Sequence, residues 1–187
     1  MKRNKIGVTK LVNKYRNIAN NIDNNVDVYV NNFEWYCEPE NNEIYISKPK
    51  KEKTSLQAFL HSVDIKLPRN RKYLLDIIPP YVWSFLHEMG HLQTEKKIYI
   101  ILTPYRKLTD FLSLHFSHKS KLMDKLTNLM YYNMIDEVQA TKWAVNYVIQ
   151  NEKQVLKHSK ELAKIYKNYF KKSIDIILLK CYNLIIK

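Results

Sequence analysis

The stretch His-Glu-Met-Gly-His, His87–His91, constrains the fold of this chain more than any other feature of its sequence. It follows Pro79-Pro80 and a run of apolar and aromatic residues, and proline favours the first turn of a helix. At about 100° per residue, the two histidines lie about 40° apart on one side of such a helix. Phe85, Met89 and Leu92 form its apolar back. The stretch therefore predicts a helix that packs against a core and presents two imidazoles together.

Two imidazoles one helical turn apart are a typical half of a zinc site, because both nitrogens can reach one point about 2.0–2.1 Å away. Glu88 lies beside this point rather than aimed at it, where its carboxylate can take a proton from an attacking water. Gly90 is one of only two glycines in the chain, and glycine within a helix costs roughly 0.5–1 kcal/mol relative to alanine. Its position predicts the close approach of a backbone or a substrate. The alternative is an ordinary amphipathic helix with two unrelated histidines.

Glu137, in the helical segment 133–150, is the candidate for the third protein ligand that a catalytic zinc site needs. It shares a helix face with small and apolar residues, namely Ala140, Thr141, Ala144 and Val148. A carboxylate on such an inward face is costly to bury unless a cation meets it. A metal ion would meet this need, and a buried arginine or lysine is the alternative. Asp136 points about 100° away and is the weaker candidate.

The pattern H-E-x-G-H followed by E-x-x-A-x-x-aromatic-A resembles the gluzincins, the zinc-peptidase clan whose third ligand is glutamate. In particular it is similar to the ImmA/IrrE family of intracellular metallopeptidases. The resemblance implies that His87, His91 and Glu137 bind Zn²⁺ and that Glu88 is the catalytic base. It covers the surroundings of the two motifs, which 45 residues separate. Ala140, Trp143 and Ala144 match the family, whereas Thr141 stands where the wider clan usually has Asp or Asn.

What the resemblance implies about function is hydrolysis of peptide bonds in a protein or peptide substrate. Members of the family commonly cleave a DNA-binding repressor, often one encoded beside them on a phage or mobile element. The chain would then be a site-specific regulatory protease. The family fold places the edge strand of a small sheet beside the active-site helix, where this strand pairs with an extended substrate. A hydrogen-bond donor for the oxyanion is also expected, and the sequence leaves five candidates open: Tyr131, Tyr132, Tyr147, His115 and His118. His115 and His118 are otherwise interpreted as surface histidines.

Alternating apolar residues predict a small antiparallel sheet before the motif helix. Its runs are 26–30 and 42–47, separated by a turn at Asn41-Asn42 and by the sequence FEWYC, 33–37. We expect the run 42–47 to be the edge strand that lies beside the motif helix.

Helical patterns account for most of the remaining chain. We expect helices over 1–22 and 55–67, and from Tyr81 onward with a break around Pro104. The first of these helices is basic and has one apolar stripe, formed by Val8, Leu11, Val12, Tyr15 and Ile18. The chain contains no internal repeat and no Gly/Ser linker, and 187 residues suffice for one core. The prediction is therefore a single, mainly helical α+β domain of zincin-like fold over 1–187, with a basic helical extension at 151–187.

Lysines dominate the formal net charge of +13. Six of them recur every three or four residues and form one face of the C-terminal helix: Lys153, Lys157, Lys160, Lys164, Lys167 and Lys171. Such a face is either solvated or meets an acidic partner, such as DNA near a bound repressor or an anionic membrane surface. Because no recognisable nucleic-acid-binding module is present, nucleic acid is expected only as a secondary partner. The alternative function is a catalytically inactive metal-binding, nucleic-acid-binding or partner-binding protein.

The location expected from the sequence is the cytoplasm. The first residues carry charge but no continuous apolar run, so we expect no signal peptide. No window approaches about 18 uncharged apolar residues, so no membrane span is expected. Cys37 and Cys181 are too few for a disulfide framework and too far apart for a metal knuckle, so we expect both thiols to be reduced.

Overall fold

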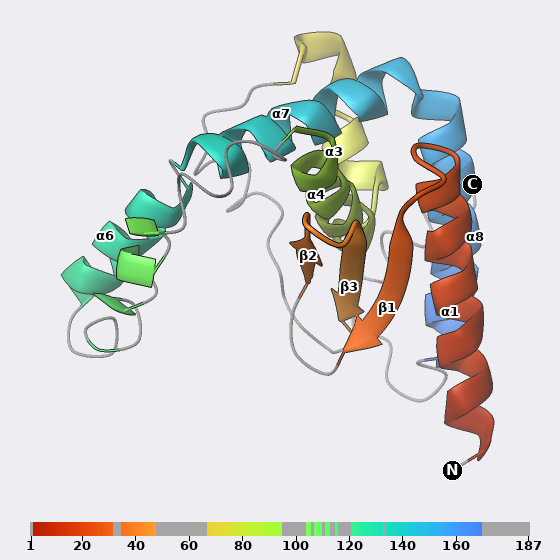
Figure 1. Cartoon of the computed structure of the whole chain (residues 1–187). Helices are drawn as coiled ribbons and strands as arrows, with labels where there is room; N and C mark the ends of the chain where they lie inside the picture. Colours follow the sequence, from red (N-terminus) through yellow and green to blue (C-terminus); the bar gives the residue numbers. More distant parts are fainter. Residues whose placement is uncertain are drawn as a thin grey trace.

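The structure, a computed structural model, describes residues 2–31, 35–47, 67–94, 104–105, 107–109, 111–112, 115, 121–132 and 134–169. Its amino-terminal part consists of helix α1 (Lys2–Asn20) and strands β1 (Asp27–Asn31), β2 (Tyr36–Glu38) and β3 (Glu43–Ser47). The 3-10 turn η1 (Arg69–Arg71) and the short α3 (Leu74–Ile77) precede α4 (Pro80–Thr94). Helices α6 (Lys121–Tyr132), α7 (Ile135–Gln150) and α8 (Glu152–Tyr169) follow (Figure 1). The fold is α+β and mainly helical with a small sheet, as predicted.

The sheet is mixed, and its strand order is β1-β3-β2. β3 pairs in parallel with β1 and antiparallel with β2, across a turn in which Asn42 adopts a positive φ of 56°. The prediction of a purely antiparallel sheet with 42–47 at its edge was wrong, because this run is the central strand β3. β2, from the stretch FEWYC, is the edge strand beside α4 instead. Alternation along a strand is the same in parallel and antiparallel pairs, so it could not distinguish the two arrangements.

The core lies between the sheet and the helices α1 and α4. The stripe predicted for the first helix is buried at Leu11, Tyr15 and Ile18, and the inner face of the sheet contributes residues such as Val28 and Ile44. α1 contacts β1 along one side and α8 along the other (Figure 1). The predicted amphipathic first helix is thereby confirmed, because its apolar stripe joins the sheet to the C-terminal helix.

Helix α4 begins at Pro80, as the proline pair predicted, and is buried from Phe85 through Leu92. It lies against β2 and β3 on one side and packs along α7 on another. Gly90 permits this packing, because a Cβ atom at this position would lie 2.4 Å from the carbonyl oxygen of Ala140. The close approach predicted at Gly90 is therefore that of the backbone of α7.

Several predicted elements fall wholly or partly outside the described residues. The expected helix at 55–67 lies there except for Leu67, and so do residues 95–103 before the predicted break at Pro104. Within the predicted C-terminal extension, α8 is helical as far as Tyr169, whereas 170–187 lie outside. None of the described helices combines the length and apolar character that crossing a membrane requires.

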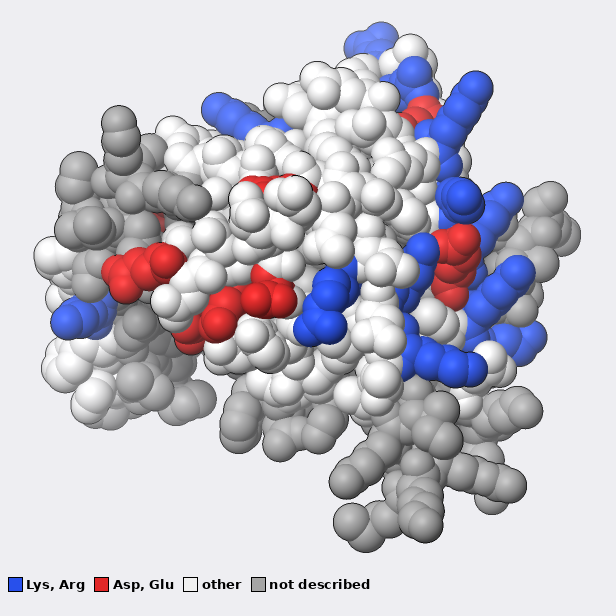
Figure 2. Space-filling model, turned by 45° about the vertical axis from the view of Figure 1, so that its right-hand side comes forward, with Lys and Arg blue, Asp and Glu red and all other residues white. Residues whose placement is uncertain are grey.

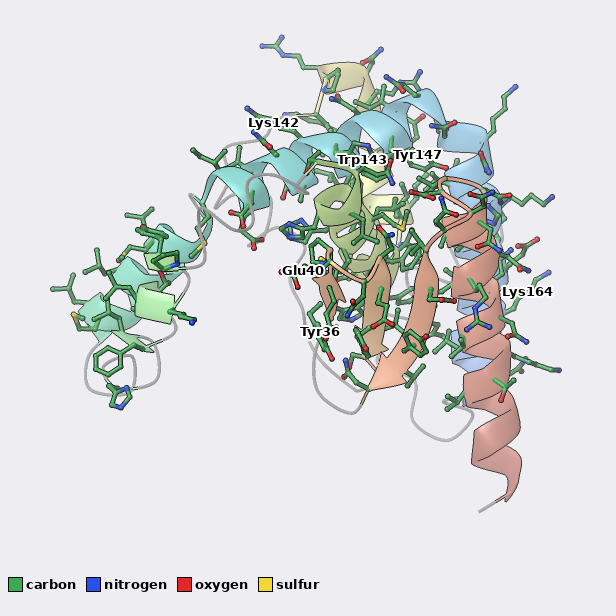
Figure 3. All side chains as sticks on the ribbon, in the orientation of Figure 1. Tyr36, Glu40, Lys142, Trp143, Tyr147 and Lys164 are labelled. Carbon is green, nitrogen blue, oxygen red and sulfur yellow. The ribbon has the colours of Figure 1, made fainter. Side chains whose placement is uncertain are left out.

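Basic side chains gather on the side of the molecule that α1 and α8 form (Figure 2). The lysines of α8 contribute to this surface, and Lys164 points away from the body of the protein (Figure 3). Five of the six predicted face positions are exposed: Lys153, Lys157, Lys160, Lys164 and Lys167. The sixth, Lys171, lies outside the described residues. The predicted lysine face of α8 is thus confirmed over its described length.

Candidate metal centre

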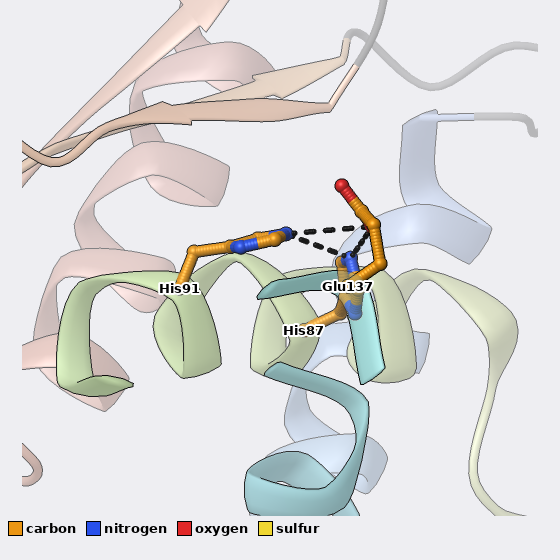
Figure 4. A group of neighbouring side chains, drawn as sticks. All are labelled: His87, His91 and Glu137. Carbon is orange, nitrogen blue, oxygen red and sulfur yellow. Dashed lines mark hydrogen bonds and ion pairs between the residues drawn. The ribbon is translucent and has the colours of Figure 1, made fainter. Parts of the chain in front are cut away.

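The structure brings together the three residues that the sequence predicted as metal ligands. α4 carries His87 and His91 one turn apart, and α7 crosses this helix so that Glu137 projects between them (Figure 4). Nε2 of His87 lies 3.0 Å from Oε2 of Glu137 and 3.0 Å from Nε2 of His91. Nε2 of His91 lies 3.6 Å from the same carboxylate oxygen. Three electron-pair donors from two helices therefore converge on one point.

The spacing of these donor atoms fits a metal ion. Ligands about 2.0–2.1 Å from a tetrahedral zinc ion are about 3.3–3.4 Å apart, and the three observed separations of 3.0–3.6 Å bracket this value. The group of His87, His91 and Glu137 could thus hold a metal ion without rearrangement of the helices. Two imidazoles and one carboxylate are a donor set that suits zinc and leaves a fourth position for water or substrate.

The three side chains are buried, so their charges have to be balanced within the site. The exposed fractions of His87, His91 and Glu137 are 5%, 4% and 2%. Burial alone would raise the pKa of Glu137, but hydrogen bonds with the two histidines outweigh it and hold this pKa below its ordinary range. Glu137 therefore remains a carboxylate, the form that binds a metal ion. The partners it meets at the centre are imidazoles, as a metal-ligand interpretation requires.

Thr141 contacts the ring nitrogen of His87 that is not directed at Glu137. It lies one turn after Glu137 on α7, and its hydroxyl oxygen is 3.2 Å from Nδ1 of His87. When Nδ1–H donates to this hydroxyl, Nε2 carries the lone pair that a metal ligand needs.

Glu88 is buried beside the three convergent residues, with 8% of its surface exposed. Burial raises the pKa of its carboxyl, and the nearby imidazoles of His87 and His91 offset part of this effect. A hydrogen bond from the thiol of Cys37 on β2 also lowers this pKa. A carboxylate with a raised pKa in this position is suited to accept a proton and release it again.

Cys37 is a site neighbour that the sequence did not reveal. It was interpreted only through cysteine counts, yet it pairs with Ile44 in the sheet register and so shares the inner face with this buried residue. Its partial burial and its contact with Glu88 follow from this register. The alternation of side chains along the edge strand could have placed Cys37 on the inner face. The edge strand was predicted to be the run 42–47 instead.

The remaining candidates are placed as follows. Asp136 is fully buried but is not one of the three convergent residues, in agreement with its weaker ranking. His115 is exposed, and its Nδ1 lies 2.9 Å from the carbonyl oxygen of Phe111. Tyr147 stacks on Trp143 on α7, with ring centroids 5.2 Å apart (Figure 3). The side chains of Tyr131, Tyr132 and His118 lie outside the described part of the chain, so the oxyanion donor stays open.

Comparison of the chain with protein-family models, with curated proteins and with solved structures gives no match. The case for a function therefore depends on the local geometry of the site. This geometry consists of a His/His/Glu group on two packed helices, a buried carboxylate next to it, and the edge strand of a sheet alongside.

Proposed function

We propose that this protein is a zinc-dependent metallopeptidase similar to the ImmA/IrrE family. The observation that carries the proposal is the position of Glu137, which reaches from α7 to within 3.0 Å of His87 Nε2 and 3.6 Å of His91 Nε2. Two helices thus supply the three ligands that a gluzincin site requires, and 45 residues separate His91 from Glu137. An accidental H-E-x-x-H helix has no reason to meet a buried glutamate at this point.

The proposed roles follow from the chemistry of the side chains. His87, His91 and Glu137 would hold the zinc ion, which, when bound, supplies Lewis acidity and lowers the pKa of water toward about 7. Glu88 accepts a proton from the attacking water and passes it to the amine that leaves as the peptide bond breaks. Thr141 positions the His87 ring. Burial of the group keeps bulk water from competing with these interactions.

Strand β2 is the proposed docking edge for the scissile peptide. It is an edge strand next to α4, and one of its side chains, Cys37, contacts Glu88. An edge strand presents backbone N–H and C=O groups that can pair with an extended peptide. Pairing with β2 would bring the backbone of such a peptide close to the catalytic carboxylate. This role was predicted for the run 42–47, and we propose it for β2 instead because β3 is the central strand.

The substrate class proposed by resemblance is a DNA-binding repressor. Cleavage of such a protein at one site would make this chain a regulatory protease, active where host and mobile-element genes are controlled. Purified repressors encoded by neighbouring genes are the first substrates to test.

Glu88→Gln tests the proposed mechanism. The variant keeps the shape of the side chain but removes the proton acceptor, so we expect it to retain zinc and to lose peptide hydrolysis by a factor of at least about 100. Hydrolysis is measured by mass spectrometry on a mixture of proteome-derived peptides, with the exposed substitution Asp76→Asn on α3 as the matched control. A Glu88→Gln variant that hydrolyses peptides as fast as the wild type would exclude Glu88 from the reaction.

A second candidate function is binding to nucleic acid through the lysine face of α8. The observation that favours it is that five lysines of this face are exposed in the structure: Lys153, Lys157, Lys160, Lys164 and Lys167. Such binding would weaken steeply with salt and would be unaffected by Glu88→Gln. Titration of duplex DNA at two salt concentrations distinguishes the two functions, because peptide hydrolysis depends on Glu88 and phosphate contacts do not.

A further inference from the structure

Three tyrosines form a row across the outer face of the sheet. Tyr29 on β1 and Tyr36 on β2 both pair with Tyr45 on β3. The ring centroids of Tyr29 and Tyr45 are 5.5 Å apart, and those of Tyr36 and Tyr45 are 4.5 Å apart with an interplanar angle of 7°. Tyr29 and Tyr36 remain 41% and 40% exposed. We call this stacked set the tyrosine row; it leaves a large aromatic surface open on the face opposite the core.

A second row on the same face consists of carboxylates. Asp27 and Glu38 are both the register partners of Glu43, so three acidic residues stand side by side across the sheet. Like charges directly opposite one another destabilise a sheet. Within the described chain, Glu43 accepts a hydrogen bond from Tyr45 at 2.7 Å and Glu38 one from Asn41 at 3.0 Å, and both donors are uncharged. The acidic row is thus an energetic cost to the free protein that a positively charged partner would relieve.

Both rows end at β2, the strand next to the metal centre. Along this strand Cys37 points inward to Glu88, whereas Tyr36 and Glu38 point to the outer face. Tyr36 and the following turn residue Glu40 lie at this end of the sheet (Figure 3). A peptide strand added to β2 would place alternate side chains beside Tyr36 and Glu38, at the distance of neighbouring strands in a sheet, about 4.5–5.5 Å.

We propose that the substrate segment that pairs with β2 carries lysine or arginine on the outer face of the sheet, beside Glu38 and Tyr36. This inference rests on the proposed peptidase function and names the class of peptide that the site accepts. Glu38, with Glu43 behind it, provides the opposite charge. The tyrosine row provides an aromatic surface for the cation and for the aliphatic stem of the same side chain.

The proposed preference for basic side chains is the opposite of the preference that the net charge of the chain would give. A protein with a formal net charge of +13 attracts acidic peptides and repels basic ones at long range. A preference for basic side chains therefore has to come from the local acidic and tyrosine rows. The pKa of Tyr36, the tyrosine next to the edge, is raised first by desolvation and then by the negative charges of Glu38 and Glu43.

The test measures binding of three fluorescent, strand-forming peptides to full-length protein that carries Glu88→Gln and is loaded with zinc, so that no peptide is cleaved. The peptides share one sequence except that alternate positions are lysine, glutamine or glutamate. We expect the lysine peptide to bind tightest and the glutamate peptide weakest. Adding Glu38→Gln or Glu43→Gln should weaken binding of the lysine peptide by about two- to fivefold. Asp76→Asn, the matched control at an exposed site on α3, should not.

Several results would overturn the inference. These are equal binding of the three peptides, preference for the glutamate peptide, no binding, or an equal effect of Asp76→Asn and Glu38→Gln. Failure of the proposed function looks different, because the wild-type protein would then leave the whole proteome-derived peptide mixture intact. Cleavage of that mixture without enrichment of lysine or arginine near the cut would retain the peptidase and reject the basic preference.

Discussion

Thr141 places its hydroxyl 3.2 Å from Nδ1 of His87, and Nε2 of the same ring lies 3.0 Å from Glu137. Its position on α7, one turn after Glu137, means that a single helix supplies both a proposed ligand and the group that orients another. The short Thr141 side chain reaches His87 because Gly90 and Ala140 let the two helices approach closely.

Thr141→Val tests this support. Valine preserves the shape of the side chain but removes the hydrogen-bond acceptor, and loss of such a partner typically weakens metal binding by about 10–100-fold. We expect a zinc affinity lowered by at least about tenfold, measured by competition with a chromophoric chelator. Thr141→Ser, which keeps the hydroxyl, should bind zinc nearly as tightly as the wild type. Equal affinities for the valine and serine variants would show that the hydroxyl plays no part.

Among single residues, the periodicity of the helices was enough to single out three residues that could hold a metal ion. His87, His91 and Glu137 were identified because residues three to four apart share a helix face, and all three are buried together. Cys37 was missed because its inward orientation depends on pairing with β3, a contact between strands that no local pattern encodes. The site could thus be predicted where it depends on one helix and not where it depends on sheet register.

At the scale of elements, the crossing of α4 and α7 holds the site together. Gly90 faces the backbone of α7, and an added Cβ atom would be 2.4 Å from the oxygen and 2.8 Å from the Cα atom of Ala140. Both are backbone atoms that cannot rotate away. The distance between α4 and α7 therefore sets the distance between the histidines and Glu137.

Gly90→Ala should destabilise the protein although alanine favours helix formation. We expect the free energy of unfolding to fall by about 1–3 kcal/mol, because the methyl group forces the helices apart, and zinc affinity to fall with it. Urea denaturation and zinc titration measure the two effects. Asn146→Ala, on the exposed side of α7, is the control and should change neither. An unchanged or higher stability of Gly90→Ala would contradict the packing described here.

The contact between α1 and α8 contains a buried histidine. His158 is 8% exposed, its Nδ1 lies 3.6 Å from Oε2 of Glu161, and Lys14 forms an ion pair with the same glutamate. Burial lowers the pKa of His158, and the positive charges of Lys14 and Lys157 lower it further, against the opposing effect of Glu161. The folded protein therefore binds a proton at this site less readily than the unfolded chain.

This shift predicts a loss of stability in mild acid. Because the pKa is lower in the folded state, the unfolded chain takes up the proton first, and stability falls as the pH drops below about 6.5. Chemical denaturation of the wild type and of His158→Gln across this range should give a smaller loss for the variant. His115→Gln, at an exposed position, should behave as the wild type. Identical pH dependence of the wild type and His158→Gln would be evidence against this role of His158.

The order of the strands in the sheet could not be predicted from the sequence. Each strand is three to five residues long, and two of them have nearly the same apolar alternation. The turn predicted at Asn41-Asn42 lies between β2 and β3, but nothing local determines on which side of β3 the strand β1 lies. That choice follows from packing of α1 against β1 and of α4 against β2.

For the whole molecule, the structure separates two kinds of charged surface. Lysines and arginines cover the side formed by α1 and α8 (Figure 2), whereas the acidic row lies across the sheet and ends at β2 beside the metal centre. The net charge of the sequence concealed this division, because a sum of +13 contains no information on where the carboxylates gather. The two surfaces predict different partners, and only the one on the sheet adjoins the proposed catalytic group.

The measurement that tests the central claim most directly is the zinc content of the purified protein by elemental analysis. The account predicts about one zinc per chain in the wild type. It also predicts none in a His87→Ala/His91→Ala variant and strongly reduced zinc in Glu137→Ala, with circular dichroism confirming that both variants are folded. A wild-type protein that contains no zinc, even after incubation with excess zinc, would contradict the account, as would a Glu137→Ala variant that retains a full equivalent.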